Sequence, residues 1–194
     1  MRFLIASALM ASAAIATPAL AQDAPAPDKE FQGFKIVGNT GIDRVNAGGD
    51  GETGLSYGGT VGYDYQAGKA VFGIEGGIDG STTKRCDSNV VVAGDELCAR
   101  TGRDLYVGGR IGAVVGGKAL LYVKGGYTNA RAVADYTVGA TTTKTGDNLD
   151  GVRAGAGVEL NVSRNIVGRV EYRYSNYEQD VSRHQALVGL GVKF

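Results

Sequence analysis

Tryptophan is absent from this 194-residue sequence, histidine occurs once, and there are only three prolines. All three prolines lie before residue 28, so no later residue interrupts a β-ladder by lacking an amide proton. Past residue 21 there is no run of even ten consecutive apolar residues, which excludes a transmembrane helix from that part of the chain. Basic and acidic residues number 20 each, and this balance gives no reason to expect nucleic acid as a partner.

Glycine, by contrast, is abundant. There are 32 glycines, and many lie inside segments that otherwise have the pattern of strands. In a soluble sheet so many glycines would weaken the strands. In a small, tightly curved barrel they leave room for crowded interior side chains and let the backbone bend.

The N-terminus has the pattern of an export signal. Arg2 supplies a positive charge, residues 3–16 are apolar and small, and Ala19-Leu20-Ala21 is a small-x-small cleavage site. A membrane anchor is the alternative, but Pro18 interrupts the stretch and no stop-transfer charges follow. We therefore predict a signal peptide over 1–21, cleaved after Ala21, and a polar, flexible lead-in over 22–30.

Alternation of apolar and polar residues with period two recurs eight times in the rest of the chain. The clearest example is 55–65, where leucine, valine and three tyrosines alternate with small and polar residues. These segments predict eight β-strands, at 33–42, 55–65, 70–79, 104–114, 119–132, 151–160, 166–174 and 184–194.

The connections between these strands alternate in length. Those at 66–69, 115–118 and 161–165 are short, whereas those at 43–54, 80–103, 133–150 and 175–183 are long and rich in Gly, Asp, Asn, Ser and Thr. Short turns at one rim and long loops at the other are typical of outer-membrane barrels. We predict an all-β fold over 31–194: an eight-stranded, antiparallel, up-and-down transmembrane β-barrel with short periplasmic turns and long extracellular loops.

The two faces of each predicted strand differ in a way that indicates which one meets lipid. One face is apolar, and six of its tyrosines (57, 63, 65, 127, 172 and 174), many near strand ends, suit the headgroup boundary. The other face mixes glycine with charges of both signs. An arginine or lysine turned toward mid-membrane lipid would cost about 2–4 kcal/mol, so we predict an interior charge network of Glu75, Asp79, Arg110, Lys124, Arg153, Glu159, Arg169, Glu171 and Arg173.

The last strand ends the sequence on an aromatic residue, Phe194, with Val192 and Gly189 before it. This ending and the Glu-Tyr-Arg-Tyr segment at 171–174 carry a family resemblance. From Phe31 to Phe194 the chain resembles the small outer-membrane β-barrel proteins of the opacity-antigen and Omp25/Omp31-like type, relatives of the transmembrane domain of OmpA. Since nothing follows Phe194, we do not carry over the cell-wall tethering of full OmpA proteins.

The resemblance implies how the protein is assembled and where it resides. Gly189, Val192 and Phe194 would be the C-terminal assembly signal, read by periplasmic chaperones and the barrel-assembly machinery. The expected location is the outer membrane of a Gram-negative bacterium, in contact with its lipid and lipopolysaccharide, as a monomer.

Two cysteines, Cys86 and Cys98, are separated by eleven residues. In an exported chain they predict a disulfide, which would contribute about 3 kcal/mol in the chain-entropy model. Free thiols are the alternative, and two thiols without nearby histidines make a poor metal site.

No catalytic, cofactor-binding or metal-binding motif stands out. Ser182 and His184 could share a strand face near the outer rim, but spacing alone does not place a base within reach of a nucleophile. The hypothesis is a non-enzymatic, structural and surface-exposed barrel with a filled interior and four extracellular loops. A narrow porin-like channel for small solutes is the alternative, although aqueous channels need about 16 strands; an outer-membrane lipid hydrolase is the third.

Overall fold

The computed structural model describes residues 29–47 and 50–194. The predicted signal peptide, its cleavage site after Ala21 and residues 22–28 of the lead-in lie outside this part. Within it no helix is long and apolar enough to cross a membrane. The strands are β1 (Gly33–Ala47), β2 (Asp50–Ala67), β3 (Ala70–Ser81), β4 (Lys84–Ser88), β5 (Asp95–Val115), β6 (Ala119–Val138), β7 (Thr141–Asn161), β8 (Ile166–Tyr177) and β9 (Ser182–Lys193).

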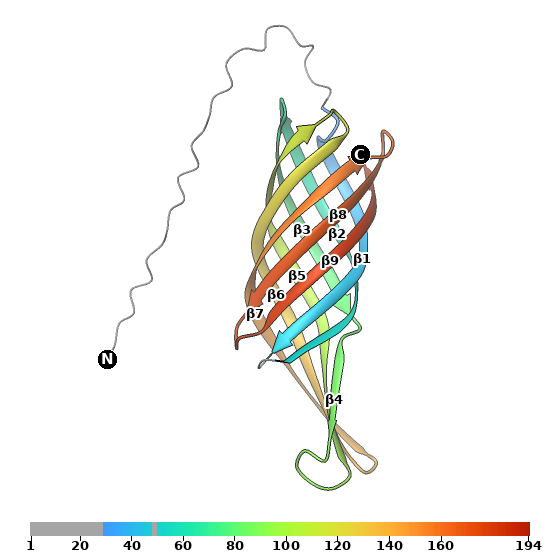
Figure 1. Cartoon of the computed structure of the whole chain (residues 1–194), viewed down its shortest axis with the longest axis vertical. Coiled ribbons are helices and arrows are strands. Elements are labelled where there is room, and N and C mark those ends of the chain that lie inside the picture. The colour runs from blue at the N-terminus through green and yellow to red at the C-terminus, as the bar shows by residue number, and fades with distance from the viewer. Residues whose placement is uncertain (1–28, 48–49) are drawn as a thin grey trace, which may run out of the picture.

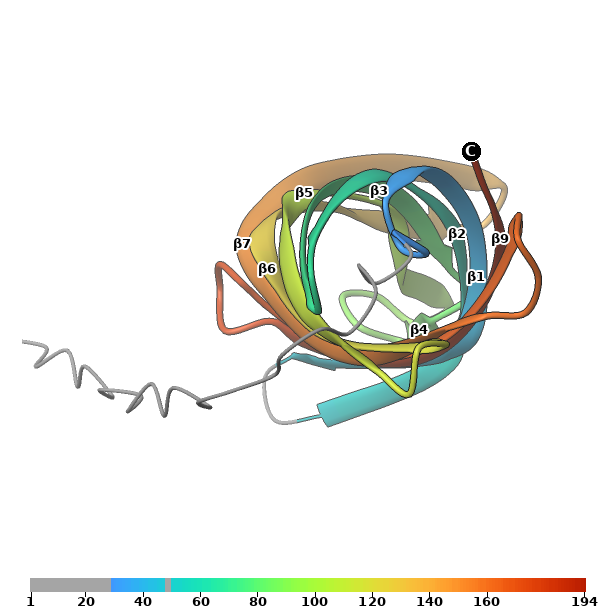
Figure 2. The same ribbon diagram turned by 90° about the horizontal axis from the view of Figure 1, so that it is seen from above.

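Eight of these strands form a closed ring (Figures 1 and 2). The sheet order runs β3-β2-β1-β9-β8-β7-β6-β5, and pairing of β3 with β5 closes it. Every pairing is antiparallel, and β4 lies outside the ring, paired with β5 alone. The prediction of an all-β, antiparallel, up-and-down fold is confirmed.

The two ends of the barrel differ (Figure 1). The end near the C-terminus carries the tight turns that follow β2, β5 and β7, and we call it the short-turn end. From the opposite end, the long-hairpin end, β4 to β7 project well beyond the ring.

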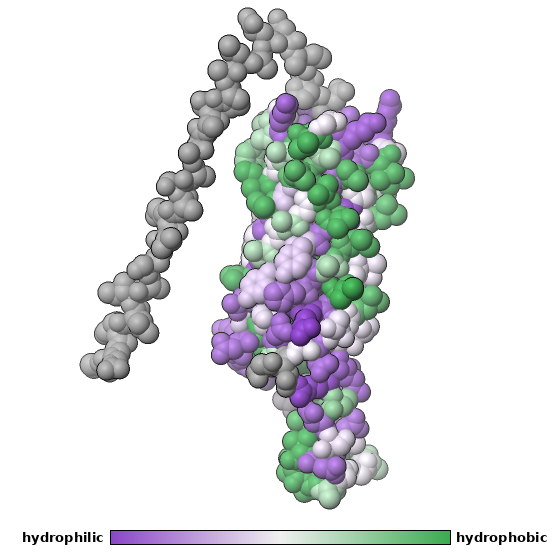
Figure 3. Space-filling view, in the orientation of Figure 1, coloured by the Kyte–Doolittle hydropathy of each residue, from purple (hydrophilic) through white to green (hydrophobic). Residues whose placement is uncertain are grey.

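The side chains of the wall alternate between the interior and the outer surface. Along β8, Val167, Arg169, Glu171 and Arg173 are buried, while Val170 and Tyr172 between them are 62% and 49% exposed. In Figure 3 the apolar side chains gather over the barrel wall toward the short-turn end, and polar ones dominate where the hairpins leave it. An apolar exterior around a charged interior is the arrangement expected of a lipid-facing barrel.

The strands extend further into the predicted long connections than the sequence indicated. The strands continue into them: β6 and β7 pair as far as Val138 and Thr141, and β5 begins at Asp95. The segment 133–150 contains five threonines, two valines and a tyrosine, and such β-branched and aromatic residues suit strands. At the long-hairpin end, regular β-structure therefore covers much of these connections, and shorter loops such as 89–94 remain at the tips.

Glycine makes room in the interior, as its abundance suggested. A Cβ atom built at Gly58 would overlap the carboxylate of Asp79 and the carbonyl oxygen of Ile78. A larger residue at this position of β2 would displace a charged group of the interior.

Candidate functional site

The interior is filled by three layers of charged side chains. The layer nearest the short-turn end contains Lys35, Asp64, Arg110 and Glu159, from β1, β2, β5 and β7. Lys35 Nζ donates to Glu159 Oε1 over 2.8 Å, and Arg110 Nη1 donates to Glu159 Oε2 over 3.0 Å. Arg110 Nε also donates to Asp64 Oδ1 over 2.9 Å. Because both acids are shared between two cations, this layer ties opposite walls of the barrel together.

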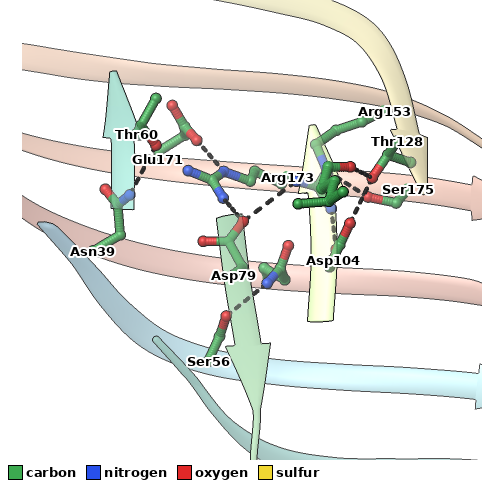
Figure 4. A network of polar contacts seen from close by, with 12 residues as sticks. Asn39, Ser56, Thr60, Asp79, Asp104, Thr128, Arg153, Glu171, Arg173 and Ser175 are labelled. Atoms are coloured by element: carbon green, nitrogen blue, oxygen red, sulfur yellow. Dashed lines mark hydrogen bonds and ion pairs between the residues drawn. The ribbon is translucent and has the colours of Figure 1, made fainter. Parts of the chain in front are cut away.

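The middle layer is built on Lys124 and Arg173 (Figure 4 shows its Arg173 side). Lys124 Nζ lies 2.9 Å from Glu171 Oε1 and 2.5 Å from Glu75 Oε1. Arg173 donates to Glu171 through Nε and to Asp79 Oδ2 through Nη1, the latter over 2.8 Å. These five side chains come from β3, β6 and β8, so this layer also crosses the barrel.

The layer nearest the long-hairpin end converges on Asp104 of β5 (Figure 4). Its carboxylate accepts from Arg153, from Arg183 Nη1 over 2.6 Å and from the Tyr177 hydroxyl over 2.9 Å. Arg183 in turn donates to Asp43 through Nε over 2.8 Å. Asp104 and Asp43 are both 0% exposed.

The structure places all nine predicted interior charges inside the ring, each less than 10% exposed. It adds charged residues that the sequence analysis did not assign to the interior: Lys35, Asp43, Asp64, Asp104 and Arg183. The alternation could have revealed Asp64, because it shares the face of β2 that carries Ser56 and Thr60. Asp43 and Arg183 were missed because both lay in segments predicted to be loops.

The short-turn end is closed by Phe31. This side chain is 1% exposed and packs with Val71, Leu120 and Tyr122. Its amide donates to Gln66 Oε1 over 2.9 Å, and the carbonyl of Glu30 accepts from Asn161 Nδ2 over 3.1 Å. The described end of the predicted lead-in is therefore fastened to the barrel.

Cys86 and Cys98 are joined in a disulfide and lie directly opposite each other in the β4–β5 pairing. Glu96 lies close to both sulfur atoms. Thiolates are the metal ligands that cysteine supplies, and in the disulfide neither sulfur is a thiolate. This bond clamps the hairpin just below its tip.

The tip beyond the disulfide is organised by Asp95. Its carboxylate accepts hydrogen bonds from the amides of Val90, Val91 and Val92 over 2.7 to 2.9 Å, and from the Tyr136 hydroxyl of β6 over 2.8 Å. The bond from Val92, with those from Tyr136 and the other amides, lowers the pKa of Asp95 to about 2 from an ordinary 3.8. Hydrogen bonds that favour the ionised form hold the loop in one conformation.

This arrangement makes the order of the tip depend on pH. Because the folded-state pKa is lowered, the stabilisation is complete above pH 3.8 and is lost as the pH falls through about 2. Amide hydrogen exchange in 89–94 should therefore stay slow down to about pH 3 and become faster near pH 2, after correction for intrinsic rates. Asp95→Ala should show fast exchange at every pH, and Asp87→Ala, at an exposed position of β4, should behave like the wild type. A fast-exchanging wild-type tip at pH 7 would contradict the assignment.

The structure gives His184 a role in packing. Its Nδ1 lies 2.6 Å from the Tyr172 hydroxyl, and its ring centroid is 4.9 Å from that of Tyr174. Ser182 and His184 are both on the outward face of β9, but the hydrogen bond found at His184 goes to Tyr172. A nucleophile–base pair is not formed in this arrangement.

The predicted assembly signal lies at the closing seam of the barrel. Gly189 pairs with Asn39 across the β1–β9 contact, and Val192 is exposed on the outer wall. The Phe194 amide donates to the carbonyl of Phe34 over 2.9 Å, and its ring, 72% exposed, lies 6.3 Å from that of Phe34. The last residue therefore makes few contacts inside the folded barrel.

Known proteins with similar sequences are outer-membrane proteins. The 22 kDa outer membrane protein of Rhizobium leguminosarum bv. viciae is 29% identical over 187 residues, which cover 87% of this chain and 80% of that protein. The 25 kDa outer-membrane immunogenic protein of Brucella ovis is 31% identical over 144 residues, covering 69% of this chain and 61% of that protein.

Solved structures show the same fold at low sequence identity. Ail, the attachment invasion locus protein of Yersinia pestis, crystallised with the heparin analogue sucrose octasulfate, is 18% identical with a TM-score of 0.59, over 84% of this chain and 100% of that one. Neisserial surface protein A is 14% identical with a TM-score of 0.56, over 83% and 97%. The family model described as outer membrane protein beta-barrel domain matches residues 6–194. With this match over nearly its whole length, the chain belongs to the outer membrane protein beta-barrel domain family.

Proposed function

We propose that the protein is a non-enzymatic, structural component of the outer membrane that presents its long hairpins to the outside of the cell. The observation that carries this proposal is the filled interior: three layers of ion pairs cross the barrel between Phe31 and Arg183. In an eight-stranded ring the lumen is just wide enough for side chains. Each layer would have to be broken for a solute to pass.

The filled interior also argues against the alternative function, a narrow channel for small solutes. Removing one partner of a buried ion pair costs about 3–5 kcal/mol, so spontaneous opening of even one layer is rare. Purified protein in planar lipid bilayers should show no stepped conductance, while a water-filled porin in the same bilayer should. Stepped currents from the wild type that change in Arg153→Ala would assign a conducting path to the interior and overturn the proposal.

The proposal includes export through a signal peptide cleaved after Ala21 and insertion as a monomer by the barrel-assembly machinery. The apolar exterior would contact membrane lipid and, in the outer leaflet, lipopolysaccharide. Protease digestion of intact cells tests the topology. Cleavage within 89–94 is expected, together with protection of the tight turns.

Deleting Phe194 should impair assembly far more than it weakens the finished barrel. In the structure this residue contributes one backbone hydrogen bond and one tilted ring contact with Phe34. We expect a several-fold lower yield of folded protein in the outer membrane, but refolded protein should lose only about 1 kcal/mol, the usual size of one hydrogen bond. Phe34→Ala, which removes the ring contact but keeps the C-terminus, is the matched control. Equal cellular yields for the deletion and the wild type would contradict the role of Phe194 as an assembly signal.

A further inference from the structure

The long-hairpin end of the barrel contains an apolar cavity of about 250 Å³. Its walls are formed mainly by small and aliphatic side chains from β1, β5, β6, β7 and the β8–β9 turn: Val45, Ala99, Ala130, Ala132, Leu149 and Val181. Arg183, held by Asp43 and Asp104, forms the floor. Because that floor belongs to the filled interior, the cavity is blind. A dry apolar cavity of about 150 Å³ can hold benzene, so this one has room for a few aliphatic groups.

The rim of the cavity is basic. Arg85, Arg100 and Arg131 line it, against a single acid, Glu52. Arg100 is paired with Asp135 over 3.1 Å, but Arg131 is exposed, and among the described residues it has no ion-pair partner. The cavity therefore suits an apolar group that carries negative charge beside it.

The tip of the β4–β5 hairpin is apolar with acidic residues beside it, and so it complements the apolar cavity and its basic rim. Val90, Val91 and Val92 are 47%, 73% and 49% exposed. Between Cys86 and Cys98 there are three acidic residues and no basic one; Asp95 is buried within the tip, and Asp87 and Glu96 are exposed on its two sides. We call residues 89–94 the valine tip. Three consecutive exposed valines are an apolar surface that water solvates poorly, and such patches commonly mark interaction sites.

The valine tip is also held ready for binding. Asp95 fixes the three valine amides, Asn89 Oδ1 accepts from the Gly94 amide over 2.8 Å, and the disulfide closes the hairpin behind them. A loop that is already ordered loses little conformational entropy when it docks. These contacts therefore lower the entropic cost of inserting the tip into a pocket.

The tip cannot fill the cavity of its own molecule. Ala99 and Arg100, on the same hairpin, line the cavity, and from Ala99 to Asp95 the strand leads about 13 Å away from it before the tip begins. A second molecule in the opposite orientation would place its tip in this cavity, and the tip of the first molecule would then enter the cavity of the second. Such a reciprocal contact is the two-fold arrangement that most homodimers use.

We propose that the valine tip of one molecule inserts into the arginine-rimmed cavity of a second copy in a facing membrane. The protein would thus join cell to cell while remaining a monomer within each membrane. Each contact is small and individually weak, but many copies on two apposed surfaces act together. This proposal rests on the proposed function, because it requires the long hairpins to face outward.

The test uses two-colour aggregation of bacteria that express the full chain and lack long surface polysaccharide. Val91→Asn weakens the tip and Ala132→Trp fills the cavity; both positions are exposed, so neither change overpacks the interior. Cells with the wild type should form mixed clumps, and each variant alone should reduce clumping about tenfold or more, as expected from the loss of 1.4 kcal/mol per contact. Ala140→Asn, at the tip of the neighbouring β6–β7 hairpin, should clump like the wild type.

The decisive sample mixes cells of the two variants. Val91→Asn molecules retain a cavity and Ala132→Trp molecules retain a tip, so the mixture should clump although neither variant clumps alone. A mixture that stays dispersed, or a wild type that fails to clump while its tip is cleaved by protease on intact cells, overturns the proposal. A tip that no protease reaches on intact cells would instead overturn the outward orientation on which the proposed function rests.

Discussion

Asp104→Ala is expected to destabilise the barrel by about 3–5 kcal/mol, because it leaves two buried arginines without their shared partner. The Asp104 carboxylate accepts from Arg153, Arg183 and Tyr177, and it is 0% exposed. Arg183 would keep its ion pair with Asp43. Arg153 would keep its hydrogen bonds to Ser175 and Tyr177, but its remaining acidic partner would be Asp79, 3.5 Å away. The free energy of unfolding can be measured by urea titration in lipid vesicles, followed by circular dichroism since the chain contains no tryptophan.

A surface acid provides the control for this measurement. Asp87 lies 3.4 Å from Arg85, and the side chain of Asp87 is 59% exposed. Exposed ion pairs contribute between about 0 and 1 kcal/mol, so Asp87→Ala should change the stability little. If both variants lost the same stability, the interior ion pairs would not hold the barrel together. Asp104→Asn keeps hydrogen-bonding capacity but not the charge, so its loss of stability should lie between that of Asp104→Ala and that of Asp87→Ala.

The sequence predicted which side of the wall each residue faces, because period-two alternation requires only local information. Lys124 and Arg173 were placed inward, and Tyr127 and Tyr172 outward, and their burial in the structure agrees. The short turns at 66–69, 115–118 and 161–165 were also found where expected, since β2, β5 and β7 end at Ala67, Val115 and Asn161.

The pairing of charges could not be predicted in the same way. Arg183 and Asp43 are 140 positions apart in the sequence, and Lys35 and Glu159 are 124 apart. Their contacts depend on strand register and on the width of the closed ring, which alternation does not specify. The cavity at the long-hairpin end was missed for another reason. Ala130 and Ala132 lie in a predicted strand, but the rest of its apolar wall, Val45, Ala99, Leu149 and Val181, lies in segments whose content of Gly, Asp and Thr made them look like loops.

Ile74→Arg is expected to destabilise the protein in lipid by about 2–4 kcal/mol, the cost of an arginine facing the middle of a bilayer. Ile74 is 71% exposed and lies four residues after the start of β3 at the short-turn end. With a rise of about 3.3 Å per residue and a strand tilt of about 40°, it lies about 10 Å above that rim, near the middle of an apolar band about 25 Å tall. Val92→Arg, at the valine tip, makes the same kind of change outside the membrane and should alter stability by less than about 0.5 kcal/mol. Urea titration of both variants in the same vesicles measures the two changes in the free energy of unfolding. Equal, small effects would mean that the outer face of β3 meets water, and the placement of this barrel in a membrane would then be wrong.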